Sequence, residues 1–353
     1  MGTVLIIGAG DLGERLTAAL AASGGVSRVV LAGRSFGTVA AITVTVSAAS
    51  DCAVDGAVVD ASRQDEVAQL FARTQPDLVV QCASTRSPWA LGGRGDSPAR
   101  TILAAGFALR LPYQLPIVLT VMRAAQDAGY AGPIANLSYP DGTGPVLRAL
   151  GLAPTVGLGN AGMILRRVRS TLRASSDAGE LPLVRVLGHH SQLPSSMEAD
   201  EPPPDERCRV YLGEEGTRDD SLAYRGPALE AGRGLNAITT AAAIPVLEAL
   251  LPGAAPVRWS TPAPAGLPGG YPVRIADGAV TLDLPPGLEP GEAIAYNERV
   301  ARGDGIERID DDGTVHFTAA CRQAVAGLSS ELAAPLAVAD VTERAALLDA
   351  VLG

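Results

Sequence analysis

Two of the three histidines in this chain stand side by side, in the stretch VRVLGHHSQLP at residues 184–194. Histidine, with an unperturbed pKa of about 6.5, suits proton transfer at neutral pH. The preceding residues are typical of a strand, so His189 and His190 should face opposite ways. One of them could act as a general acid or base, or both could fill a polar turn. Without a nearby carboxylate or cysteine cluster they make a poor zinc site, so we expect no metal.

A second chemical pattern lies at the start of the chain, in TVLIIGAGDLGERLTAAL. A short apolar run leads into Gly8, Gly10 and Gly13 in the spacing GxGxxG, and a helical pattern follows. Gly8 permits a tight turn, Gly10 lets backbone amides approach a pyrophosphate, and Gly13 lets the helix pack closely on the strand. We therefore predict a dinucleotide site, with a turn that binds nothing as the alternative.

The end of the next strand, RVVLAGRS, favours NADP over NAD. An NAD site usually has Asp or Glu here, whereas this chain has Gly33, Arg34 and Ser35, which suit a 2′-phosphate. NAD stays the alternative cofactor, because Arg34 could instead stack on the adenine or lie in solvent. The other residues expected to bind the cofactor follow the strand ends or begin the first helix: Asp11, Leu12, Asp60, Cys82, Ala83 and Ser84. Asp60 could equally be a helix N-cap.

The elements that must position these residues alternate between strand and helix. A strand to Asp60, a helix through residues 66–73, a strand at residues 78–82 and a helix at about residues 114–128 precede the strand PIANLS. This order predicts an α/β fold that begins with a Rossmann domain, a doubly wound parallel sheet with right-handed crossovers. We expect an NAD(P)-binding domain at residues 1–155 and a substrate and catalytic domain at residues 156–353.

Composition narrows the classes of partner. A net charge of −10 over 353 residues disfavours nucleic acid and anionic membranes, so we expect a small-molecule substrate. We find no signal peptide and no uninterrupted apolar run of about 18 residues, and we expect a cytoplasmic protein. All 28 basic residues are arginines, which excludes Schiff-base chemistry. The four cysteines form no CxxC pair, so neither a disulfide framework nor a zinc site is expected.

The second half of the chain resembles the lactate and malate dehydrogenases. NLSYP at residues 136–140 is similar to their SNP stretch, Arg166 lies on a predicted helix, and GHHSQ at residues 188–192 is similar to their GEHGD. Arg166 and His190 are 24 residues apart (190 − 166), as the family's substrate arginine and catalytic histidine are. The resemblance implies an α+β catalytic domain of this type, with His190 as the general acid/base and Arg166 holding a substrate carboxylate. His189 acting alone is the catalytic alternative.

The departures from the family pattern are equally specific. Met163 stands where the family has the acid that pairs with the histidine, and His189 replaces a Glu. Asp141 or Glu198 could supply the missing acid. LAGRS in the first half resembles the saccharopine dehydrogenase group, whose lysine chemistry is impossible here.

The long connection at residues 84–112 is typical of a lid, and its arginines could reach a carboxylate. The expected substrate-binding residues are Arg86, which has Arg94 and Arg100 as alternatives, together with Asn136, Tyr139 and Asn236.

The predicted function is an NAD(P)-dependent oxidoreductase acting on a small carboxylate-bearing 2-oxo or 2-hydroxy acid, or on an imine or amine. A cofactor-binding sensor or scaffold without turnover is the alternative, because Met163 replaces the acid. Length and resemblance suggest a homodimer or tetramer.

Overall fold

The computed structural model describes residues 2–175 and 180–353, and its first half is built on a parallel sheet. The strand order is β3-β2-β1-β4-β5-β6, and every neighbouring pair is parallel. The strands are β1 (Gly2–Ile7), β2 (Val26–Gly33), β3 (Ala53–Val58), β4 (Leu78–Gln81), β5 (Ile134–Asn136) and β6 (Val156–Gly157). The helices between them are α1 (Asp11–Ala22), α2 (Phe36–Ala49), α3 (Gln64–Thr74), α4 (Ser97–Ala104), α5 (Leu111–Asp127) and α6 (Pro140–Ala149). The predicted doubly wound sheet is confirmed.

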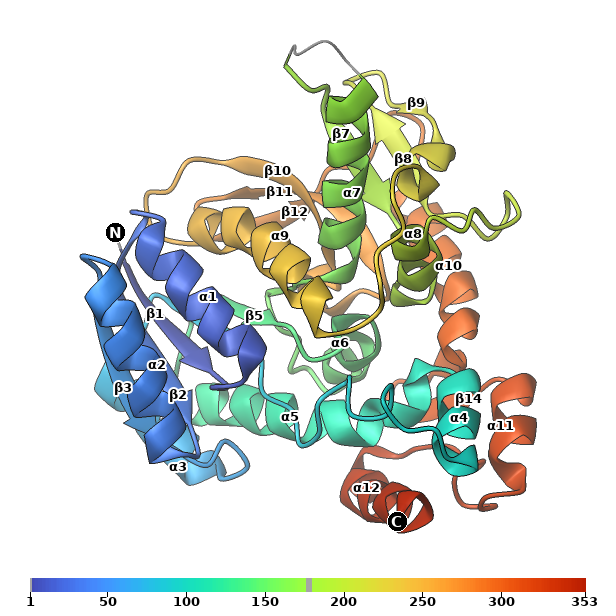
Figure 1. Ribbon diagram of the computed structural model, residues 1–353, viewed down its shortest axis with the longest axis horizontal. Coiled ribbons are helices and arrows are strands. Elements are labelled where there is room, and N and C mark those ends of the chain that lie inside the picture. Colours follow the sequence, from blue (N-terminus) through green and yellow to red (C-terminus); the bar gives the residue numbers. More distant parts are fainter. Residues whose placement is uncertain (1, 176–179) are drawn as a thin grey trace.

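Both faces of this sheet are buried at its central strands, which explains the unbroken apolar runs of β1 and β4, whereas the edge strand β3 has no buried residue. In β1, Leu5 and Ile7 pack into one hydrophobic cluster with side chains of α3 and α5. Val4 and Ile6 pack into a second cluster with side chains of α1, α2 and, from the second half, α9 (Asn236–Ala249). Figure 1 shows α1 lying beside α9, so the two halves share this side of the sheet.

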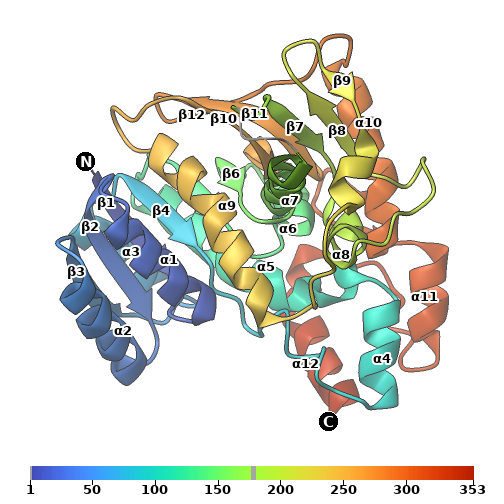
Figure 2. The same cartoon turned by 45° about the horizontal axis from the view of Figure 1, so that its top comes forward.

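The second half surrounds one helix, α7 (Asn160–Ser175). Figure 2 shows α7 near the centre, between α9 and the small antiparallel sheets. One sheet holds β7 (Val184–Leu187), β8 (Arg209–Leu212) and β9 (Thr217–Arg218), and another holds β10 (Val257–Pro262), β11 (Gly270–Ala276) and β12 (Ala279–Leu282). The remaining helices of this region are α8 (Leu193–Glu198) and α10 (Pro290–Val300). This arrangement confirms the predicted α+β second half.

The C-terminal segment returns to the first half. It contains β13 (Ile306–Ile309), β14 (Val315–Phe317), α11 (Ala319–Ala326) and α12 (Val341–Leu352). Helix α12 packs on α5, and α11 packs on α4 (Figure 1). The division at residue 155 stays a prediction, but β6 belongs to the first sheet and the last 50 or so residues complete the core of the first half.

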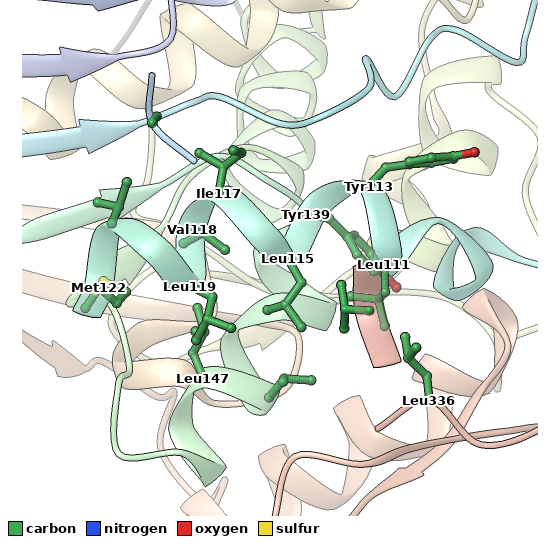
Figure 3. Close-up of a cluster of buried hydrophobic side chains, with 14 of the residues drawn as sticks. Leu111, Tyr113, Leu115, Ile117, Val118, Leu119, Met122, Tyr139, Leu147 and Leu336 are labelled. Carbon is green, nitrogen blue, oxygen red and sulfur yellow. The ribbon is translucent and has the colours of Figure 1, made fainter. Parts of the chain in front are cut away.

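Helix α5 is the centre of that shared core. Figure 3 shows Leu111, Leu115 and Leu119 along α5, with Leu336 of the C-terminal segment close by, and all four are buried. Among the described residues, no single helix has the length and apolar content needed to cross a bilayer. The segments Ser97–Ala104 and Phe107–Asp127 have that length and apolar content only when they are taken together, and the chain bends by 118° between them.

Candidate active site

The carboxyl ends of β1, β2 and β4 open into a cavity of about 670 Å³. It lies where the strand order reverses between β1 and β4, the usual ligand position in such sheets. Every residue predicted to bind the cofactor lines this cavity: Gly8, Gly10, Asp11, Leu12, Gly13, Gly33, Arg34, Ser35, Asp60, Cys82, Ala83 and Ser84. Their shared position agrees with the prediction.

The three glycines of the turn have different roles. Gly8 has a φ of +127°, and a Cβ there would lie 2.8 Å from the Ala83 nitrogen. A Cβ on Gly13 would lie 1.7 Å from the Gly8 carbonyl oxygen, so this close packing of α1 on the turn requires glycine. A Cβ on Gly10 would meet nothing within 4 Å. Gly10 therefore leaves open space in front of the α1 N-terminus, which fits the close approach of a pyrophosphate.

The end of β2 carries a free cation. Arg34 lines the cavity and makes no hydrogen bond or ion pair with any described residue. Ser35 caps α2 by accepting a hydrogen bond from the Thr38 amide (3.2 Å). Asp60 accepts hydrogen bonds from the amide (3.0 Å) and hydroxyl (2.7 Å) of Ser62, which lower its pKa. Arg34 is thus a cation available to a ligand phosphate at the end of β2, and Arg233 is a second arginine in the lining of this cavity.

A second cavity, of about 650 Å³, adjoins the first. The two share six lining residues: Leu12, Pro88, Trp89, Gln114, Leu137 and Asn236. His190 lines only the second cavity, at the 3-10 helix His190–Gln192 that follows β7. A group bound in the first cavity and a molecule bound beside His190 would therefore meet at these shared residues.

The acid that orients His190 is Asp304. His190 Nδ1 lies 2.7 Å from Asp304 Oδ2 and 3.0 Å from Oδ1, and the Tyr139 hydroxyl donates to Oδ2 (2.8 Å). The predicted acids, Asp141 and Glu198, do not contact the ring. Asp141 accepts a hydrogen bond from the His190 backbone amide (3.0 Å), and Glu198 lines the cavity as an exposed residue.

Asp304 reaches His190 because backbone segments pack closely there. It ends the 3-10 helix Ala301–Asp304 after α10, far from His190 in sequence. Gly106, with a φ of +116°, packs against it, and a Cβ on Gly106 would lie 2.4 Å from the Asp304 carbonyl oxygen. The predicted lid segment therefore includes a fixed contact that holds Asp304 in place.

The electrostatic interaction between His190 and Asp304 favours the charged form of each side chain. Burial lowers the pKa of the His190 imidazole, but the charge of Asp304 and its hydrogen bond outweigh burial, so the pKa is raised above 6.5. Burial raises the pKa of Asp304, and the charge and hydrogen bond of His190 reverse this, so its pKa is lowered. Burial, followed by the charge of Asp304, raises the pKa of Tyr139 well above 10, so its hydroxyl stays a donor.

His189 has a structural position. Its side chain is fully buried and does not line the cavity. Nδ1 accepts a hydrogen bond from the Ser191 amide (3.1 Å) and caps the 3-10 helix, while burial lowers the pKa of the ring. Its predicted catalytic role is therefore corrected to that of a helix cap.

Arg166 also lies outside the cavity, which corrects its predicted role. Its Nε and Nη2 donate to the Ala241 carbonyl of α9 (3.1 and 2.5 Å), and its guanidinium carbon lies 5.5 Å from the Trp259 ring centroid. The residues of α7 that do line the cavity are Asn160 and Met163. Resemblance placed Arg166 on the correct helix, but its side chain joins α7 to α9.

Arg86, predicted to bind substrate, is fixed to the C-terminal helix. Its Nη2 pairs with Asp349 Oδ1 of α12 (2.9 Å), and it does not line the cavity. The two alternative arginines also have partners. Arg94 forms an ion pair with Asp96 (2.7 Å), and Arg100 donates a hydrogen bond to the Gly95 carbonyl.

The prediction missed Arg110, the arginine that does line the cavity. Its guanidinium carbon lies 3.7 Å from the centroid of the Phe107 ring, and His190 contacts the same ring at 4.4 Å between centroids. Among the described residues its hydrogen bond is a long one, from Nη1 to the Pro88 carbonyl (3.4 Å), and buried Nε has no partner. Burial lowers the pKa of this guanidinium to about 10. The sequence signal that points to it is its place in the predicted lid segment, beside Arg86, Arg94 and Arg100.

The three predicted polar pocket residues have different positions. Asn136 is buried outside both cavities and donates to the Thr143 hydroxyl (3.0 Å), so its predicted substrate contact is corrected to a structural one. Tyr139 lines the second cavity. Asn236 lines both cavities and donates to Asp11 Oδ2 (2.7 Å). In residues 2–175 and 180–353 no group of three or more His, Cys, Asp or Glu side chains could hold a metal ion.

Comparison with known proteins shows which folds this chain is similar to. Residues 2–99 match the family model described as KR domain. No curated protein matches the sequence significantly. The malate dehydrogenase of Picrophilus torridus has a similar structure, with a TM-score of 0.54, 14% identity and coverage of 86% of this chain and 96% of that chain.

Two further solved structures are similar. The malate dehydrogenase of Plasmodium falciparum has a TM-score of 0.53 at 11% identity, covering 86% of this chain and 96% of that one. A lactate dehydrogenase of Cryptosporidium parvum, complexed with lactic acid and nicotinamide adenine dinucleotide, has a TM-score of 0.50 at 17% identity, covering 85% and 96%. These matches show that the chain shares the fold of lactate and malate dehydrogenases.

The geometry predicts that Asp304→Asn lowers the pKa of His190. The substitution removes the charge that raises this pKa and leaves the burial that lowers it, so the pKa should fall below that of the wild type. Proton NMR titration can measure it, because the chain has three histidines and the His190→Asn spectrum identifies the signal.

The matched control is Asp310→Asn, which removes the carboxylate 2.7 Å from His316 Nε2. It should perturb the His316 signal and leave the His190 titration unchanged. An unaltered His190 pKa in folded Asp304→Asn protein would contradict the assignment.

Proposed function

We propose that this chain is an NAD(P)-dependent oxidoreductase that prefers NADP and acts on a carboxylate-bearing carbonyl or imine, or on the corresponding alcohol or amine. The observation that carries the proposal is that His190, paired with the buried Asp304, lines a cavity that adjoins the glycine-turn cavity. The shared fold supports it, since the similar structures are dehydrogenases and one was solved with lactic acid and nicotinamide adenine dinucleotide.

The cofactor would be held by the first cavity. Backbone amides of the turn from Gly8 to Gly13 suit the pyrophosphate, and Arg34 with Ser35 suits a 2′-phosphate. When bound, NAD(P) supplies or accepts the hydride. The chain's own task is then to bind the substrate beside the cofactor and to move one proton.

His190 is the residue proposed to move that proton. With Nδ1–H held by Asp304, Nε2 is the nitrogen left for exchange with the substrate. In reduction, the charged imidazolium donates its Nε2 proton to the substrate oxygen or nitrogen, and in oxidation neutral Nε2 accepts it. Asp304 stays ionised and stabilises the imidazolium, aided by the hydrogen bond from Tyr139.

Arg110 is the residue proposed to bind the substrate carboxylate, in place of Arg166. Its buried Nε lacks a partner, and a guanidinium edge matches a carboxylate with two parallel hydrogen bonds. Arg110 and His190 contact the same Phe107 ring, so an acid bound by Arg110 would place its neighbouring carbon near His190.

The alternative of a cofactor sensor without turnover rested on Met163 replacing an acid. Asp304 supplies an acid at 2.7 Å from the ring, so this reason no longer favours a sensor over an enzyme.

For the proton transfer, we expect His190→Asn to lower turnover by roughly 10²- to 10⁴-fold, because a positioned acid or base is lost. The NADPH Kd should stay nearly unchanged, since His190 does not line the first cavity. Steady-state kinetics and fluorescence titration measure the two effects. The control His316→Asn should keep wild-type turnover, and a His190→Asn variant that also keeps it would exclude this mechanism.

For cofactor choice, Arg34→Ala should weaken NADPH binding by roughly tenfold and NADH binding much less, because a charged hydrogen bond to the 2′-phosphate is lost. Calorimetric titration with both cofactors measures the ratio. Arg28→Ala, which removes an arginine paired with Asp55 on the neighbouring strand, is the control and should change neither Kd. Equal losses for NADPH and NADH in Arg34→Ala would remove the NADP preference.

For substrate binding, Arg110→Ala should raise KM for a carboxylate-bearing substrate roughly tenfold to a hundredfold. The KM for an aldehyde that lacks the carboxylate should change little, so comparison of the two isolates the charge interaction. Arg166→Ala is the matched control and should leave the ratio of the two KM values at its wild-type level. If Arg166→Ala changes this ratio and Arg110→Ala does not, the assignment is reversed.

A further inference from the structure

The cavity beside His190 has one polar end and one apolar end. Arg110 and His190 both contact the Phe107 ring and mark the polar end. Another part of the cavity wall comes from α7, α8 and the segment before α9, and it is mostly apolar, with Asn160 and Glu198 as its polar side chains. Met163, Met197 and Leu235 are buried and pack together there, with Leu229 against them. We propose that this wall is a binding subsite for a branched, aromatic or longer aliphatic group of the substrate.

This inference deepens the proposed function and rests on it for the reaction itself. The cavity holds about 650 Å³, within the range that takes a ligand of many non-hydrogen atoms. A three- or four-carbon acid would fill a small part of it and leave the apolar wall in contact with water. Burial of apolar surface is favourable in proportion to its area, so a larger apolar group would bind more tightly.

Met163 explains how the wall became apolar. It stands on α7 where the resembled family has the acid that pairs with the histidine, and here Asp304 supplies that acid from another segment. Helix α7 therefore presents a thioether to the cavity, with Met163 3% exposed. Methionine side chains adapt to irregular shapes, and two of the chain's four methionines are on this wall.

Charged groups are few on the wall. The charged side chains that line the cavity are Arg110 and His190 at the polar end and Glu198. Glu198 is exposed, unlike its buried neighbour Met197. An acid bound with its carboxylate at Arg110 would thus direct its remaining carbons along Phe107 toward Met163 and Leu235.

Two measurements on the full chain test the subsite. Calorimetry in the presence of NADPH gives Kd for straight-chain carboxylates from acetate to octanoate, and steady-state assays give kcat/KM for straight-chain 2-oxo acids of three to eight carbons. We expect Kd to fall roughly threefold to fourfold for each added methylene. The kcat/KM should rise by a similar factor until the cavity is filled.

A variant localises the effect. Leu229→Asn places a polar group on the wall and should reduce the ratio of acetate Kd to octanoate Kd by roughly tenfold. Leu328→Asn changes another half-buried leucine, outside this cavity, and should leave the ratio at its wild-type value.

The outcomes separate the two proposals. Flat Kd and kcat/KM series, together with turnover of oxo acids, would overturn the subsite and leave the oxidoreductase in place. A Kd that falls with chain length, without reduction of any oxo acid or imine, would support the subsite and reject the oxidoreductase. A chain-length effect that Leu229→Asn and Leu328→Asn leave equally intact would also overturn the subsite.

Discussion

The hydrogen-bonded ion pair between His190 and Asp304 is the contact on which the rest of the second cavity depends. Its two members lie 114 positions apart in sequence, and the Asp304 side chain is only 6% exposed. Removing one partner of a buried pair costs on the order of 3–5 kcal/mol, because the other charge loses its compensation. The contacts of Asp304 with Tyr139 and Gly106 therefore help to hold the carboxylate in place beside His190.

Beyond this pair the chain folds back on its first half. Asp304 ends the short 3-10 helix after α10, and the segment that follows it carries α11 and α12, which pack on α4 and α5. The C-terminal segment thereby fixes the predicted lid, since Asp349 of α12 pairs with Arg86. An acid on α7 would not have required these contacts. Its absence leaves α7 free to present Met163 to the cavity and Arg166 to α9.

The parts of the molecule that sequence reasoning could find are those with local patterns. The glycine turn, the alternating strands and helices, and the histidine pair each lie within a few residues, so periodicity and spacing indicate them. No local pattern indicates Asp304. It is one of the 38 acidic residues of the chain, and the residues around it form no recognisable motif. Its role follows from a contact between distant segments, which neither periodicity nor spacing reports.

The arginines illustrate the same limit. Spacing placed Arg166 on the helix that borders the cavity, but it does not report which neighbour a side chain contacts. Met163 and Arg166 are three residues apart, so at about 100° per residue their side chains leave the helix only about 60° apart. Met163 nevertheless lines the cavity, whereas Arg166 donates to the Ala241 carbonyl of α9. Arg110 lies in the same predicted lid segment, and its place in the cavity wall, its packing on Phe107 and its unpartnered Nε distinguish it from Arg86, Arg94 and Arg100.

The charges around His190 also couple substrate binding to proton uptake. Arg110 lies near enough to lower the pKa of His190, whereas Asp304 and Asp141 raise it. A carboxylate bound by Arg110 would offset the positive charge of the guanidinium and remove part of this lowering effect. Binding of an acid would therefore favour the charged imidazolium. In the proposed mechanism, the form of His190 that reduction requires would then be stabilised by the same anion that Arg110 would position, so the two cations of the cavity would act together on one substrate.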